Sequence, residues 1–107
     1  MSDGTLIAGG QDQWWLATLG RTVVWARLRV LEAGTAEVLD SDGNTLPFDS
    51  EDSARAALMD AEFAALDGMD VDDADARGFS LEELVPPYAN DDAQLRALMV
   101  QTFARRH

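Results

Sequence analysis

The chain has 107 residues, with no cysteine and no lysine, and its 20 acidic residues against eight arginines give a net charge of −12. This is the length of one domain, residues 1–107, which can bury a hydrophobic core without covalent cross-links. The lack of cysteine excludes disulfides and cysteine-based metal sites. The charge opposes binding of nucleic acid or an anionic membrane by the fold as a whole, so we expect neither as a partner.

Residues 1–11 are small and polar around a short apolar run, and we expect a loose lead-in. They lack the basic and the long apolar segments of a signal peptide, and no stretch of the chain approaches the ~18 apolar residues of a membrane span. The composition is rich in alanine and uses arginine as its only strong base, which indicates a GC-rich coding sequence. Together these features predict a bacterial protein of the cytoplasm.

Residues 13–48 have the aromatic and β-branched composition of strands. We expect four of them, over 14–19, 22–31, 36–39 and 45–48. Turn residues join them at Gly20-Arg21, Glu32–Gly34 and Asp40–Asn44. Pro47 has no N–H to donate to a neighbour, so the last strand should lie at an edge of the resulting antiparallel meander.

These turns fix which residues face each other and therefore which face of the sheet is buried. In this register Trp14 lies opposite Arg27, Trp15 opposite Ala26, Leu16 opposite Trp25, Leu28 opposite Val38 and Arg29 opposite Glu37. The expected core face carries Trp15, Ala17, Val24, Ala26, Leu28, Val30 and Val38. The opposite face, half apolar and half basic, carries Trp14, Leu16, Trp25, Arg27, Arg29, Leu31 and Glu37.

After Phe48 the pattern becomes helical. A first helix should begin at Asp49 or Ser50 and run to about Leu66. A second should begin at Asn90 and continue through the basic residues at 105–107. Between them, residues 67–90 form an acidic connector with a helical turn over 81–85. The predicted fold class is α+β, a four-stranded antiparallel β-meander followed by two α-helices packed on the sheet.

The residue types typical of nucleophilic catalysis are missing, and no pair of carboxylates stands out for acid–base chemistry. There is no cysteine or lysine to act as a nucleophile, and the only histidine is His107, the last residue. The glycine patterns of phosphate-binding and dinucleotide-binding loops are also absent. We therefore expect no catalytic residue, no cofactor and no enzyme activity.

The aspartates were considered as calcium ligands. The segment that begins at Asp73 places Asp75 at position 3 and Gly78 at position 6 of an EF-hand loop. However, Arg77 stands at position 5, and Glu83 falls at position 11 instead of 12. A solvated acidic connector is the better interpretation, so no metal site is predicted.

The charge map gives the functional hypothesis. Residues 37–92 carry 17 acids and two arginines, a net charge of −15, whereas residues 1–36 are neutral. We expect a non-catalytic protein-binding module for a basic protein partner, of the inhibitor, antitoxin or immunity type. The candidate contacts are Asp70, Asp72, Asp73, Asp75, Trp14 and Trp25.

Two alternatives stay open for the acidic segment: a metal- or small-ligand-responsive regulatory domain that uses the connector, and acidity that serves solubility alone. The Trp14/Trp25 face also has two interpretations. Either a helix covers it, with Trp14 stacked on Arg27, or it forms a binding surface, because Trp and Arg are enriched at interface hot spots.

Overall fold

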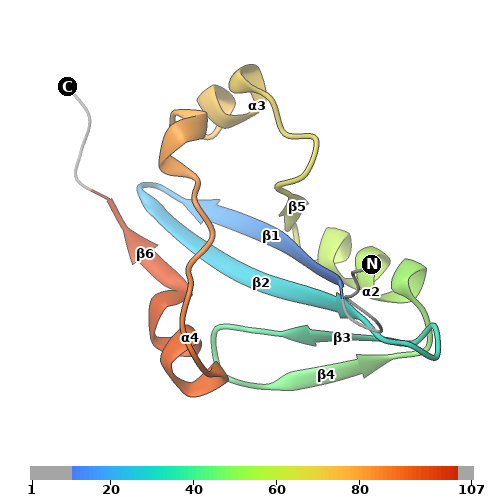
Figure 1. The fold of residues 1–107 in the computed structure, drawn as a ribbon. Coiled ribbons are helices and arrows are strands. Elements are labelled where there is room, and N and C mark those ends of the chain that lie inside the picture. The colour runs from blue at the N-terminus through green and yellow to red at the C-terminus, as the bar shows by residue number, and fades with distance from the viewer. Residues whose placement is uncertain (1–10, 104–107) are drawn as a thin grey trace, which may run out of the picture.

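The computed structural model describes residues 11–103, so residues 1–10 of the expected lead-in over 1–11, and the basic residues 105–107, lie outside the described residues. Strands β1 (Gln11–Leu19), β2 (Thr22–Val30), β3 (Ala36–Leu39) and β4 (Thr45–Phe48) form the antiparallel meander (Figure 1). Leu16 lies opposite Trp25, and Leu28 lies opposite Val38. The predicted register is therefore confirmed, and β4 forms an edge of the sheet.

Among the residues that the structure describes, the sheet has six strands, two more than the sequence predicts. Strand β5 (Ala64–Ala65) pairs with β1, and strand β6 (Val100–Thr102) pairs with residues 22–24 of β2. Strand β3 pairs only with residues 27–30 of β2. Because β3 is short, residues 22–24 on the same edge of β2 remain free to pair with β6.

Helix α2 (Glu51–Asp60) begins where the sequence predicts. The Ser50 side-chain oxygen accepts a hydrogen bond from the Ser53 amide at 3.1 Å. The helix ends at Asp60 rather than near Leu66, because Glu62 takes a positive φ of 69° and the chain then pairs with β1. The predicted length of this helix is therefore wrong.

Helix α2 covers the face of the sheet that the register assigns to the core. The buried residues there are Trp15, Ala26, Leu28, Ala36, Val38, Ala54 and Leu58. The pattern of alternation along β1 to β3 thus identified one buried face correctly.

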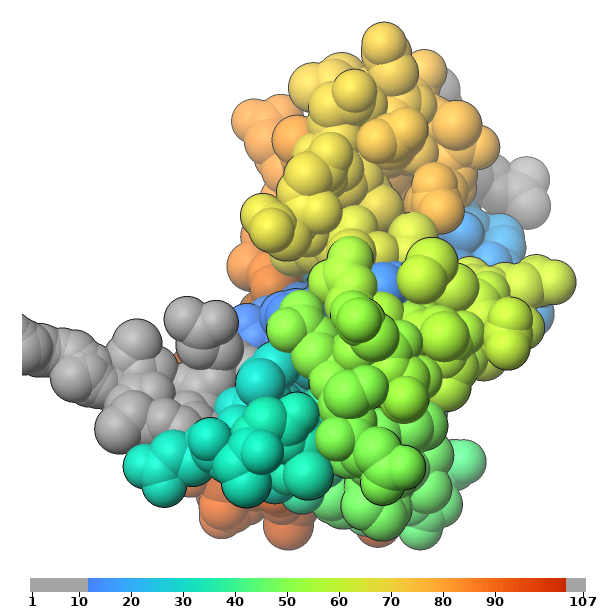
Figure 2. Space-filling view, turned by 90° about the vertical axis from the view of Figure 1, so that its right-hand side faces the viewer, coloured from blue at the N-terminus to red at the C-terminus, as the bar shows by residue number. Residues whose placement is uncertain are grey.

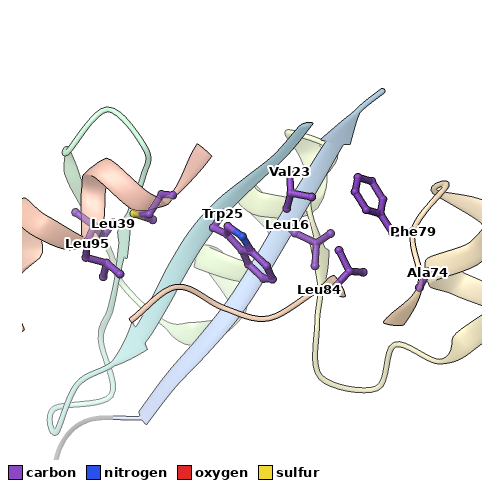
Figure 3. Packing of buried hydrophobic residues seen from close by; sticks show 9 residues of the cluster. Leu16, Val23, Trp25, Leu39, Ala74, Phe79, Leu84 and Leu95 are labelled. Atoms are coloured by element: carbon purple, nitrogen blue, oxygen red, sulfur yellow. The ribbon is translucent and has the colours of Figure 1, made fainter. Parts of the chain in front are cut away.

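The opposite face is buried as well, by three short helical elements and the chain between them. These elements are α3 (Val71–Ala76), the 3₁₀ turn η1 (Leu81–Glu83) and α4 (Asp92–Leu98). Figure 3 shows Leu16, Val23 and Trp25 of the sheet on the side where Phe79 and Leu84 lie. The full cluster is Leu16, Val23, Trp25, Leu39, Ala74, Phe79, Leu84, Leu95 and Met99. Residues 11–103 form an α+β fold with an antiparallel sheet and three α-helices, where the sequence predicts two.

The last helix is much shorter than predicted. Helix α4 ends at Leu98, and the Met99 carbonyl accepts a hydrogen bond from the Trp25 amide at 2.8 Å. The chain then continues as β6 along the edge of β2. Leu95 and Met99 are buried as the helical pattern predicts, but Leu98 is 43% exposed.

No helix among residues 11–103 combines the length and the apolar character needed to cross a bilayer.

Candidate functional site

Acidic side chains gather on the side of the molecule formed by α2, the chain after it and α3. We call this surface the acidic face. Its exposed residues are Asp52, Asp60, Glu62, Asp67, Asp70, Asp72, Asp73 and Asp75. Figure 2 views the molecule from this side, where the segment from α2 to α3 crosses the surface.

The one arginine between residues 52 and 75 does not neutralise the acidic face. Arg55 donates to the Gln13 side chain at 3.0 Å, pairs with Glu51 at 3.8 Å, and lies 5.0 Å from the centre of the Trp15 ring. Its charge is therefore directed toward the start of α2 and the sheet.

The four candidate aspartates have two different structural roles. Asp70 and Asp73 form a capping box: the Asp70 carboxylate accepts from the Asp73 amide at 2.8 Å, and the Asp73 carboxylate accepts from the Asp70 amide at 3.3 Å. Asp72 and Asp75 are exposed and form no ion pair with another described residue. Asp72 and Asp75 are therefore the two that are available to a partner without disturbing the fold.

The three arginines of the β1–β2 hairpin are engaged by acids from outside the acidic face. Within residues 11–103, ion pairs join Arg21 to Glu83 at 2.9 Å, Arg27 to Asp92 at 3.2 Å and Arg29 to Asp12 at 2.8 Å. Arg21 also donates to the Gly78 carbonyl and lies 4.3 Å from the centre of the Phe79 ring. These three arginines are thus paired within the fold, whereas the carboxylates of the acidic face form no ion pair among residues 11–103.

The two candidate tryptophans have different environments. Trp25 is fully buried, and its indole Nε1 donates to Gln101 Oε1 at 3.0 Å. Trp14 is half-buried, and its ring meets that of Trp25 edge-on, with centroids 6.0 Å apart. Trp25 is therefore a core residue and not an exposed contact. Trp14 contacts Trp25 instead of stacking on Arg27, whose partner is Asp92.

A hollow of about 270 Å³ lies beside Trp14, between the strands and the chain that leads into α4. We call it the Arg27 hollow. Its lining is Asp12, Trp14, Arg27, Arg29, Pro87, Tyr88, Ala89, Asn90, Asp91, Asp92 and Leu95. The hydrogen bond with Asp12, together with the nearby negative charges of Asp12, Asp92 and Glu37, raises the pKa of the Arg29 guanidinium above its ordinary value, although partial burial opposes this.

Sequence reasoning placed Arg27 and Arg29 on this face but did not find the hollow. Asp91 and Asp92 follow Asn90, the expected start of the last helix, where acids are favourable in any helix. The available signal was the pair Pro86-Pro87 followed by Tyr88, because two prolines favour an extended chain before the helix.

Within residues 11–103, no three acidic or histidine side chains converge in a geometry that could hold a metal ion. Comparison with protein-family models, curated proteins and solved structures finds no match to this chain.

Proposed function

We propose that this chain is a non-catalytic protein-binding module whose acidic face docks a basic protein partner, in the manner of an inhibitor, antitoxin or immunity protein. One observation carries the proposal. The carboxylates of residues 60–75 are exposed and have no ion pair among the described residues, whereas acids elsewhere in the fold engage Arg21, Arg27 and Arg29.

Charge segregation of this kind favours association more than stability. Like charges on one surface repel each other, so they add nothing to folding, but their summed field attracts an oppositely charged partner. Electrostatic complementarity can raise association rate constants from about 10⁵–10⁶ to about 10⁸–10⁹ M⁻¹s⁻¹ at low salt. The acidic face therefore supports fast, salt-sensitive docking of a basic surface.

The structure separates the acids that can be changed from those that hold the fold. Asp70 and Asp73 cap α3 and should be retained, whereas Asp72 and Asp75 are exposed. A matched control is available in Glu32 and Asp42, which are also exposed and lie in the turns after β2 and β3. Each double variant removes two negative charges.

The test uses the full chain as bait in a lysate of the source organism at low salt, and then the purified captured protein. Wild type and the Glu32→Gln/Asp42→Asn control should capture the same basic protein. Asp72→Asn/Asp75→Asn should bind it roughly two- to thirtyfold more weakly, since exposed ion pairs contribute ~0.2–1 kcal/mol each. The association rate should fall steeply with added salt. Equal weakening by both double variants, or a rate that ignores salt, would refute docking through the acidic face.

A further inference from the structure

Arg27 has fewer partners than a buried arginine requires. Its exposed fraction is 7%, and its one hydrogen bond among residues 11–103 runs from Nη1 to Asp92 Oδ1 at 3.2 Å. Its Nε is buried without any partner. A guanidinium has five N–H donors, and its Nε and Nη2 together form the fork that holds a carboxylate with two parallel hydrogen bonds. That fork of Arg27 is unused.

The charges around Arg27 favour a ligand that carries a positive group as well as a negative one. The lining of the Arg27 hollow holds two arginines and three aspartates, a net charge of −1. Arg29 is already held by both carboxylate oxygens of Asp12, at 2.8 and 3.2 Å. Asp91 and Asp92 stand at the rim with exposed side chains. A simple anion would be repelled by them, whereas a ligand that also carries an ammonium group would be attracted.

Apart from Asn90, the rest of the lining is apolar or aromatic. Trp14, Pro87, Leu95 and Tyr88 contribute to the walls, and Tyr88 is 83% exposed at the rim. The volume of about 270 Å³ lies just below the ~300–1,000 Å³ of typical small-molecule sites, so the ligand has few heavy atoms.

We propose that the Arg27 hollow binds a free α-amino acid with an apolar or aromatic side chain. The ligand carboxylate takes the Nε–Nη2 fork of Arg27, and its ammonium is held by Asp91 and Asp92. Its side chain lies between Trp14 and Tyr88. This site is separate from the acidic face, so either proposal can fail alone.

The chain beside the hollow makes few backbone hydrogen bonds. Residues 85–90 cross the sheet between η1 and α4 without forming a helix or strand (Figure 1). Pro86 and Pro87 have no N–H, and the amides of Tyr88, Ala89 and Asn90 have no hydrogen-bond partner among the described residues. A shift of residues 86–90 breaks no backbone hydrogen bond, because the one that Val85 donates to the Glu83 carbonyl at 3.1 Å lies before them. Ligand entry to the buried Nε of Arg27 requires such a shift, which moves the buried Pro87.

The test is a titration of the full chain followed by tryptophan fluorescence and calorimetry. L-phenylalanine and L-leucine are the probes, and N-acetyl-L-phenylalanine and L-phenylalanine methyl ester each lack one charged end. At least one free amino acid should bind saturably. The two phenylalanine derivatives should bind at least tenfold more weakly than L-phenylalanine. No saturation by either amino acid up to about 10 mM, or equal binding of the derivatives, would overturn the proposal.

Substitutions in the lining test whether the amino acid binds in the Arg27 hollow. Tyr88→Ala removes an exposed side chain from the rim and should weaken binding at least fivefold. Val85→Ala is its control, because Val85 is 62% exposed on the same segment but lies outside the lining. Arg27→Lys keeps the charge but removes the fork, and it should weaken binding at least tenfold. If Arg27→Lys does not fold, Tyr88→Ala and Val85→Ala still decide, since equal affinities in these two place the ligand elsewhere.

Discussion

Asp70 and Asp73 hold each other's backbone at the start of helix α3. The Asp70 carboxylate accepts a hydrogen bond from the Asp73 amide at 2.8 Å, and the Asp73 carboxylate accepts one from the Asp70 amide at 3.3 Å. Each bond satisfies an N–H group that the start of a helix leaves without a partner. This pair stabilises the start of α3, and α3 places the fully buried Ala74 in the cluster that contains Leu16 and Trp25.

Asp70→Ala should therefore lower the free energy of unfolding by about 1 kcal/mol, the usual effect of losing an N-cap side chain. Asp70→Asn should change it much less, because the amide oxygen also accepts from the Asp73 backbone. Asp72→Ala, one position into the same helix and without a capping bond, should cost less than about 0.5 kcal/mol. Urea denaturation measures all three, and equal costs for Asp70→Ala and Asp72→Ala would contradict the capping role.

The burial of Trp25 leads to a second prediction. Trp25→Ala should cost about 3–5 kcal/mol, because it empties a core position and leaves Gln101 without its partner. Trp25→Phe keeps most of the apolar contact but loses the indole hydrogen bond, so its cost should be smaller, about 1–3 kcal/mol. Trp14→Ala should cost less than Trp25→Ala, since Trp14 is only half-buried. Equal, small effects at both positions in thermal or urea unfolding would instead indicate an exposed aromatic face.

The strands and their register were predictable because their determinants are local. A two-residue loop at Gly20-Arg21 leaves one register for β1 and β2, and Gly20 has the positive φ of 61° that such a tight turn requires. The burial of the Trp15 face follows from alternation alone. The predictions that failed concern the helical segments after Phe48, because the strands that pair with those segments are distant in sequence.

Residues 99–103 illustrate that failure. Leu95, Met99 and Phe103 repeat every four residues, which is the helical pattern, yet the chain becomes strand β6 at Val100. The free edge of β2 beside Trp25 decides the outcome, because it offers hydrogen bonds that a continued helix would leave unmade. The Arg27 hollow was missed for the same reason: Arg27 and Asp92 meet only after the whole chain has folded. The proposed binding of a basic partner stays a prediction of the charge pattern.

Gly43 provides a third prediction, at the turn between β3 and β4. Its φ is +88°, and a Cβ atom added there would lie 2.7 Å from Cδ of Arg96 in helix α4. Gly43→Ala should therefore cost the ~1–2 kcal/mol of the left-handed backbone conformation, plus a small steric part because the exposed Arg96 side chain can move aside. In an Arg96→Ala background the steric part of the loss in the free energy of unfolding disappears, and the part due to the backbone conformation of residue 43 remains. A double-mutant cycle measures the difference, and a zero coupling energy would show that Arg96 does not pack on this turn.

Hydrogen exchange checks the mobility of residues 85–90, on which ligand entry to the Arg27 hollow depends. The amides of Tyr88, Ala89 and Asn90 have no hydrogen-bond partner among residues 11–103, so they should exchange within about tenfold of the rates of an unstructured peptide. The Trp25 amide, bonded to the Met99 carbonyl at 2.8 Å, should exchange only through global unfolding. Strong protection at Tyr88 to Asn90 would mean that the segment is a fixed cover. A carboxylate could then reach the buried Nε of Arg27 only when the domain unfolds, and amino-acid binding would be too slow to observe in a simple titration.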